Sequence, residues 1–158
     1  MNNQERLEKD LKEIEEMKNV KLAFPEEGDK TQFIVSVKVN EGLYRNKYLK
    51  FKFTLDDDWP NTPPKIVAVD KIWHPNIGCY SENTNAFVDF ATLGTSYKAS
   101  IPLSHFVFEI KYLLINFNPD DAMNIEAAHQ YKFNHEEFKE RVKEYMDNID
   151  DGYEEDDD

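Results

Sequence analysis

Apolar side chains recur every three or four residues near the start of the chain, and this spacing predicts an amphipathic helix over residues 3–18. Three runs then alternate apolar and polar residues, as strands with one buried face do: residues 20–24, 33–39 and 47–55. Residues 65–69 form a fourth predicted strand. After residue 103 the spacing becomes helical again and predicts a long helix near residues 104–116, followed by two further helices.

This order of elements predicts an α+β fold with an N-terminal helix, a four-stranded antiparallel meander and three C-terminal helices. We expect the first helix on one flank of the sheet and the long helix across its back. Residues 118–121, Asn-Pro-Asp-Asp, end the long helix and are expected to cap the next one, with Asp121 as the capping residue. Asn134 followed by Glu137 is the pattern of a capping box and predicts the start of the last helix.

The charge of the chain is concentrated at one end. The formal net charge is −13, and residues 147–158 hold eight acidic residues and no Lys or Arg. We therefore predict a domain over residues 1–149 and an acidic, disordered tail over residues 150–158. Nucleic acid is not an expected partner, because phosphate binding needs clustered bases. A basic protein surface is the better expectation for the tail, in a salt-sensitive association.

Several classes of protein are excluded by what the sequence lacks. No apolar run approaches the about 20 residues that a membrane-spanning helix needs, so no membrane partner is expected. One cysteine cannot form an intramolecular disulfide, and the polar N-terminus shows no secretory signal; both predict a cytoplasmic or nuclear protein. His105, His129 and His135 have no cysteine or carboxylate cluster at ligand spacing. Neither a metal site nor a cofactor is predicted.

Four segments carry a resemblance to the ubiquitin-conjugating enzymes, and together they extend from about Arg6 to Met146. Residues 71–77, Lys-Ile-Trp-His-Pro-Asn-Ile, contain the His-Pro-Asn motif of that family. Residues 58–65, 97–101 and 116–128 resemble its aromatic-proline segment, the segment before its long helix and its Asn-x-Glu-Ala-Ala segment. An aromatic residue before proline also favours a cis bond at Trp59-Pro60. The wording of residues 71–77 and 124–128 is most similar to the neddylation branch.

The resemblance implies a catalytic site from which the nucleophile is missing. In the family the motif asparagine stabilises an oxyanion, and a thioester cysteine follows it by about eight residues. Asn76 keeps the asparagine, but the eighth residue on is Thr84, and residues 86–89 fit the cysteine segment with Phe87 in the cysteine's place. Cys79, three residues after Asn76, is the only cysteine. Asp121 matches the family's acidic gate for the incoming lysine.

Each of these residues also has a purely structural interpretation. The Asn76 amide can stabilise an oxyanion or hold its own loop together, and the sequence leaves both roles open. His74 is expected to be a packed, hydrogen-bonded loop residue, and Asp121 is interpreted slightly more readily as a helix cap. Cys79 is a nucleophile only if its pKa is lowered and water reaches it.

The same resemblance implies docking surfaces. The first helix carries Arg6, Lys9 and Lys12, bases of the kind that meet an activating enzyme, although an ordinary charged helix face explains them at least as well. Family ligases grip an apolar residue at the position of Asn61 and a Pro-Ala pair at the positions of Ala99 and Ser100. A polar amide at Asn61 and the missing proline weaken such an anchor.

Two hypotheses result from this resemblance. The first is a degenerate variant that binds ubiquitin or a ubiquitin-like modifier, an activating enzyme, a conjugating enzyme or a ligase, cullin-type ligases included. The second is an active conjugating enzyme, a transferase that forms its thioester on a displaced Cys79.

Overall fold

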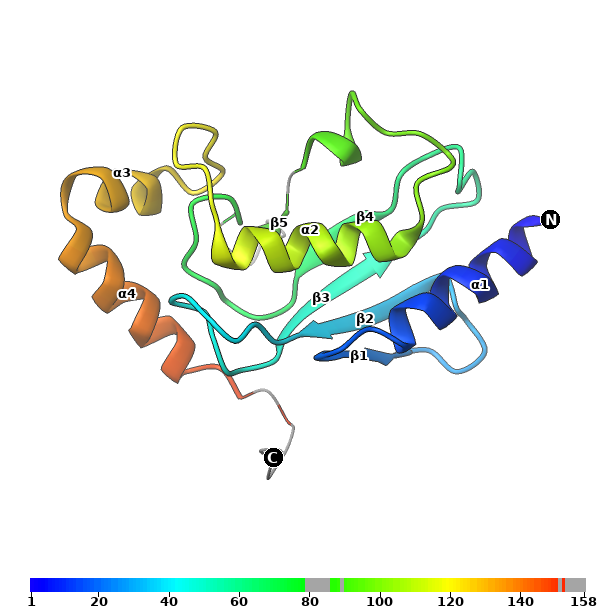
Figure 1. The fold of residues 1–158 in the computed structure, drawn as a ribbon, viewed down its shortest axis with the longest axis horizontal. Helices are drawn as coiled ribbons and strands as arrows, with labels where there is room; N and C mark the ends of the chain where they lie inside the picture. Colours follow the sequence, from blue (N-terminus) through cyan, green and yellow to red (C-terminus); the bar gives the residue numbers. More distant parts are fainter. Residues whose placement is uncertain (79–85, 89, 151, 153–158) are drawn as a thin grey trace.

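The structure is a computed structural model that describes residues 1–78, 86–88, 90–150 and 152. Its helices are α1 (Asn3–Glu15), the short 3-10 helix η1 (Ala91–Leu93), α2 (Leu103–Ile115), α3 (Ile125–Phe133) and α4 (His135–Asp147) (Figure 1). Its strands are β1 (Val20–Ala23), β2 (Gln32–Val37), β3 (Leu49–Thr54), β4 (Lys65–Ala68) and β5 (Ala86–Phe87). The N-terminal helix, the meander and the three C-terminal helices are confirmed, and so is the α+β class.

The sheet is an antiparallel meander in the order β1-β2-β3-β4-β5. Strands β1 to β4 correspond to the four predicted runs. The fifth strand is an addition: β5 pairs with β4 through Val67 opposite Phe87 and Ala68 opposite Ala86. A pair of two residues is too short to leave an alternating pattern in the sequence, which is why periodicity did not reveal it.

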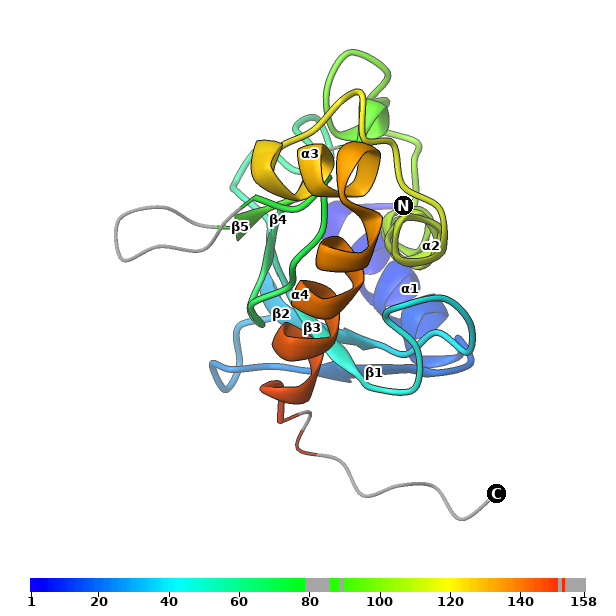
Figure 2. The same cartoon turned by 90° about the vertical axis from the view of Figure 1, so that its left-hand side faces the viewer.

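One face of the sheet and one face of α2 form the core. The inner-facing residues of β2 and β3 have no exposed surface, and Phe33 stacks on its cross-strand partner Phe53 with ring centroids 5.2 Å apart. Helix α2 crosses this face and buries Phe106, Val107 and Ile110 completely. Helix α1 packs beside α2 and β1, on the same side of the sheet (Figure 2). The predicted placement of both helices is therefore confirmed.

Asparagine side chains cap three of the four α-helices in the part of the chain that the structure describes. Asn2 accepts a hydrogen bond from the Glu5 backbone N–H at 2.8 Å, and Asn134 accepts one from the Glu137 N–H while its amide donates to the Glu137 carboxylate. The predicted capping box is therefore only half formed: Asn134 caps the helix, but its backbone N–H donates to the Gln130 carbonyl at 2.8 Å and not to the Glu137 carboxylate. The predicted cap at Asp121 is wrong: Asn124 caps α3 by accepting from the Ala127 N–H at 3.1 Å. Asp121 lies too far upstream, because the chain needs residues 122–124 to turn into the helix axis.

Some predictions fall outside the described residues. Cys79 and Thr84 do so, as do most residues of the predicted acidic tail, namely 151 and 153–158. The described part of the tail comprises Asp150 and Gly152. Among the described helices, none is long and apolar enough to cross a membrane. The Trp59-Pro60 peptide bond is cis, as expected.

Candidate functional site

The His-Pro-Asn motif lies in an extended loop after β4, and its histidine is part of the core. His74 has no exposed surface and packs against the rings of Tyr44 and Phe117, at centroid distances of 5.1 and 5.0 Å. Its Nδ1 accepts a hydrogen bond from the Asn76 N–H at 2.9 Å, and its Nε2 lies 2.8 Å from the Leu113 carbonyl. Because a carbonyl only accepts, Nε2 carries the proton and the ring is neutral. The interpretation of His74 as a packed loop residue is confirmed.

The Asn76 side chain ties the motif to the segment that follows α2. Its Nδ2 donates to the Asn118 carbonyl at 2.8 Å and to the Asp121 carbonyl at 2.9 Å, and its Oδ1 accepts from the Asn118 N–H at 2.9 Å. Both N–H groups of the amide are therefore occupied in this state. An oxyanion at this site would compete with two backbone carbonyls for the same donors.

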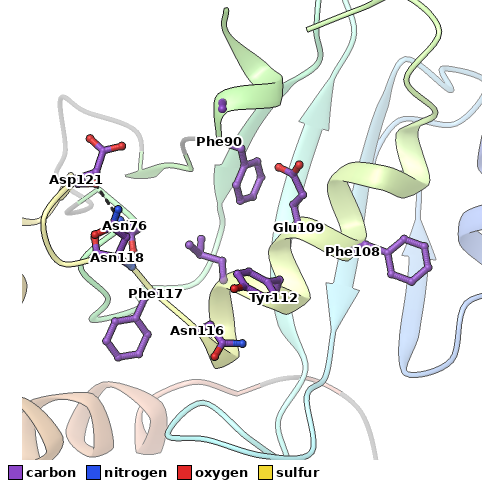
Figure 3. Close-up of a pocket in the computed structure, with 11 residues that line it drawn as sticks. Asn76, Phe90, Phe108, Glu109, Tyr112, Asn116, Phe117, Asn118 and Asp121 are labelled. Atoms are coloured by element: carbon purple, nitrogen blue, oxygen red, sulfur yellow. Dashed lines mark hydrogen bonds between the residues drawn. The ribbon is translucent and has the colours of Figure 1, made fainter. Parts of the chain in front are cut away.

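Neighbouring backbone bonds reinforce this connection. The Pro75 carbonyl accepts from the N–H groups of Met123 and Asn124, at 2.8 and 3.0 Å. The Asp121 side chain is exposed, and Figure 3 shows its carboxylate directed away from the Asn76 amide. The fold thus brings Asn76 and Asp121 together, although Asp121 contributes its backbone carbonyl to this contact.

Phe87 lies on strand β5, directly beside the motif loop. The Gly78 N–H donates to the Phe87 carbonyl at 3.0 Å, and Ile77 pairs with Val88 in an isolated antiparallel bridge. The Phe87 side chain is 38% exposed, whereas Val88 is 4% exposed. The phenyl ring therefore reaches the surface at the edge of the sheet, on a strand whose register is set by β4.

A cavity of about 620 Å³ opens between the motif loop, α2 and η1 (Figure 3). Asn76, Asn118 and Asp121 line one end of it. Sequence reasoning missed the other wall, which contains Phe90, Phe108, Glu109 and Tyr112. One signal was available: Phe108 and Tyr112 lie one turn apart on α2, outside its apolar stripe, and are 59% and 68% exposed.

Glu109 joins the cavity wall to η1. Its carboxylate accepts a hydrogen bond from the Thr92 hydroxyl at 2.8 Å and lies 2.6 Å from His105 Nε2. These contacts hold η1 against α2 and keep Phe90 and Ala91 at the rim of the cavity. The Glu109 carboxylate contacts both Thr92 and His105. A catalytic triad instead has the base in the middle, between the nucleophile and the acid that orients the base, so these three residues do not form one.

The predicted docking residues gather at the end of the molecule where α1 begins. The Arg6 guanidinium donates to the Ala99 and Ile101 carbonyls at 2.7 and 2.9 Å and pairs with Asp10 at 3.2 Å. The Tyr97 hydroxyl donates to the Pro60 carbonyl at 2.6 Å, which places the loop containing Asn61 beside the Ala99 loop.

These residues differ in what they offer to a partner. Asn61, Ala99 and Ser100 are exposed. Lys9 and Lys12 are exposed on α1, and Lys9 lies 3.7 Å from Glu13. Arg6 differs from these lysines because its charge is bound within the molecule, where it connects α1 to the loop. The described residues contain no group of three His, Cys, Asp or Glu side chains that could hold a metal ion.

His74 makes the stability of the fold depend on pH. Burial lowers the pKa of His74 from its ordinary value of 6.5 to about 4, so between these values the unfolded chain binds a proton and the native chain does not. Above pH 6.5 His74 is neutral in both states, and its burial costs no stability. As the pH falls from 6.5 toward 4, protonation of the unfolded chain lowers the free energy of unfolding. The expected loss is about 3 kcal/mol of unfolding free energy. Urea unfolding at pH 7.0, 5.5 and 4.5 measures it.

A second histidine provides the control for this measurement. His74→Gln should have a smaller pH dependence over the same range than the parent chain, whereas His129→Gln, at an exposed site, should keep it. Equal pH profiles for the parent chain and His74→Gln would contradict the assignment.

Comparison with known proteins agrees with the motif and the fold. The model of the ubiquitin-conjugating enzyme family matches residues 6–146. The NEDD8-conjugating enzyme UBC12 of Yarrowia lipolytica is 33% identical over 141 residues, 89% of this chain and 76% of its own. The Nedd8-conjugating enzyme UbcE2M of Drosophila melanogaster is 27% identical over 141 residues, 89% of this chain and 75% of its own.

A solved structure shows the same fold. The E2 domain of a Toxoplasma gondii ubiquitin conjugating enzyme superposes with a TM-score of 0.82 at 23% identity, covering 92% of this chain and 97% of that one. The resemblance to the neddylation branch is supported by the two relatives above. The chain belongs to the ubiquitin-conjugating enzyme family.

Proposed function

We propose that this chain is a degenerate member of its family, which acts by binding a ubiquitin-like modifier or the enzymes that handle it. Phe87 is the observation that carries the proposal. The resemblance of residues 86–89 to the family's cysteine segment assigns it the place of the thioester cysteine, and it lies on a strand held in register by β4 and by the Gly78 and Ile77 pairings. A phenyl ring has no nucleophilic atom with which to form a thioester.

The scaffold around Phe87 supports a role in binding. The fold is intact through α4, and the cavity beside Asn76 has exposed aromatic side chains on its wall. Exposed aromatic side chains are frequent anchors in protein interfaces. We assign the modifier to the cavity side of the molecule, an activating or conjugating enzyme to Lys9 and Lys12 on α1, and a ligase to the loops of Asn61, Ala99 and Ser100. NEDD8 is the first modifier to test, since it is named in the two relatives.

One observation favours the alternative, an active transferase that uses Cys79. The bond between Gly78 and Phe87 fixes residue 78 beside β5, and Cys79 follows it directly. Three residues span at most about 10 Å, so the Cys79 sulfur can come within reach of the Asn76 amide. In that case Asn76 and Asp121 would keep their catalytic roles.

The charging assay separates the two functions. The chain is incubated with cognate activating enzymes, ATP and either NEDD8 or ubiquitin, and the products are separated on gels with and without thiol reductant. We expect no reductant-labile adduct. An adduct that forms on the parent chain and disappears in Cys79→Ala would establish the displaced-cysteine enzyme instead.

Binding needs a separate measurement. Titration of ¹⁵N-labelled NEDD8 or ubiquitin with the parent chain should shift the resonances of the modifier. With the Tyr112→Ala chain, the size of these chemical-shift changes should fall at least about threefold. Phe133→Ala, a 75% exposed aromatic residue at the end of α3, is the matched control and should leave them unchanged. Unshifted spectra, together with no binding to activating, conjugating or ligase enzymes, would contradict the binding function.

A further inference from the structure

The outer face of the sheet, which looks away from α1 and α2, is basic in a chain that is acidic overall. Strands β1 to β4 contain no Asp or Glu and four lysines. The alternation along the strands places all four lysines on the outer face, because their neighbours in the strands, Val20, Phe51, Phe53 and Ile66, are buried in the core. The lysines are Lys21, Lys50, Lys52 and Lys65.

The middle of this face is a compact group of cations. Lys21 and Lys50 lie opposite the same residue, Ser36, on either side of β2, so they are two strand spacings or about 10 Å apart. Lys38, which lies just after β2, joins them: the ammonium groups of Lys21 and Lys38 lie 4.8 and 5.0 Å from the centre of the Tyr48 ring. We call the group formed by Lys21, Lys38, Lys50 and Lys52 the lysine face.

Two lysines hold the end of α4 and the residues that follow it beside this face: Lys47, just before β3, and Lys50, on β3. Lys47 Nζ donates to the Met146 and Ile149 carbonyls at 2.8 and 2.6 Å. Lys50 Nζ donates to the Asp150 carbonyl at 3.2 Å and pairs with Asp70 at 3.1 Å. The chain thus leaves α4 and arrives at Lys50, a member of the lysine face, at the point where its acidic stretch begins.

The chain turns there as well. The Gly152 N–H donates to the Asp150 side chain at 3.0 Å, and Gly152 has a φ of 71°, a value that glycine adopts readily. The turn comes directly after the contact with Lys50. From this position, the eight residues 151–158 can extend over at most about 26 Å, which exceeds the width of the lysine face.

We propose that residues 150–158 bind across the lysine face of their own sheet. Seven of these nine residues are Asp or Glu and none is basic, so their charge complements the four lysines. Attachment at Lys47 and Lys50 keeps the start of the acidic stretch, Asp150, within about one Debye length of the face, where attraction between charges is least screened. The tail then competes with any acidic partner for the outer face. This inference goes beyond the proposed function and does not depend on the state of the nucleophile.

Zero-length crosslinking of the full chain tests the proposal. A carbodiimide joins lysine ammonium groups to carboxylates that touch them, and mass spectrometry of the digest identifies the pairs. We expect crosslinks from Glu154–Asp158 to Lys21, Lys38 or Lys52, with yields that fall at least about fivefold in 0.5 M NaCl. Lys9 and Lys12, which are exposed on α1, are the internal controls and should form few crosslinks to residues 154–158.

Two further measurements distinguish the proposal from its alternatives. In an equimolar mixture of ¹⁵N-labelled and unlabelled chains, both peptides of each crosslink should carry the same isotope, because the tail binds its own chain. Crosslinks between a labelled and an unlabelled peptide would show that the tail binds a second copy. Changing the seven acids of residues 150–158 to Asn or Gln should shift the backbone amide resonances of the lysine face and leave those of α3 in place. Unchanged resonances, or equal crosslinking to Lys9 and Lys12, would overturn the proposal.

Discussion

In the charging assay, the double variant Phe87→Cys, Cys79→Ala is expected to form a reductant-labile adduct with a modifier. The single variant Cys79→Ala is expected to form none. The physical reason is the position of residue 87. Its strand is paired with β4, its carbonyl is bonded to Gly78, and its side chain is 38% exposed, so a sulfur there is accessible beside the Asn76 loop. We expect at least about a tenfold rise in adduct over the background.

Val88→Cys in the same background is the matched control. Val88 is the next residue and is only 4% exposed, so a sulfur there is shielded and should accept no modifier. Thermal unfolding of both variants checks that they are folded. If the folded Phe87→Cys chain still carries no adduct, residue 87 is not in the cysteine's place, and the assignment of the missing nucleophile to Phe87 is wrong. Phe87 is the eleventh residue after Asn76, so this experiment also tests the longer spacing.

Replacing Phe53 by Ala is expected to lower the free energy of unfolding by about 3–5 kcal/mol. Phe53 has no exposed surface and stacks on Phe33 across β2 and β3, so its removal leaves a cavity that the sheet and α2 cannot close. A single domain has a total stability of about 5–15 kcal/mol, so this loss is a large fraction of it. Urea unfolding followed by far-UV circular dichroism measures the change.

An exposed phenylalanine supplies the comparison for Phe53. Phe133→Ala removes the same side chain from a site that is 75% exposed and should change the stability by less than about 0.5 kcal/mol. Similar losses in the two variants would contradict the placement of Phe53 in the core.

The sequence predicted the elements whose residues repeat over several turns or strand periods. The apolar faces of α1, α2 and the first four strands were recognisable because burial imposes a period of 3.6 or 2 on any element with one covered side. The ends of these elements were predicted less accurately, with errors of up to three residues. Strand β5 left no period to recognise, and it is the strand that places Phe87.

Local chemistry was predicted correctly where the partners are close in sequence. The Asn134 cap joins residues three apart, and its bond from the Glu137 N–H forms as expected, although the return bond of a capping box to the Asn134 N–H does not. The cap of α3 was assigned to Asp121, but several Asn and Asp residues between positions 118 and 124 can cap a helix. The sequence does not say at which of them the helix begins. In the structure Asn124 has that position.

The sequence by itself determined the family, the fold class and the absence of a cysteine at the usual place, because these depend on motif wording and on local periodicity. Only the tertiary structure decided how the polar residues are used. The Asn76 amide is bonded to carbonyls 42 and 45 residues away, and Arg6 is bonded to a loop 93 residues away. Such partners meet only after the chain has collapsed around α2, and no pattern along the chain encodes a contact between segments that distant.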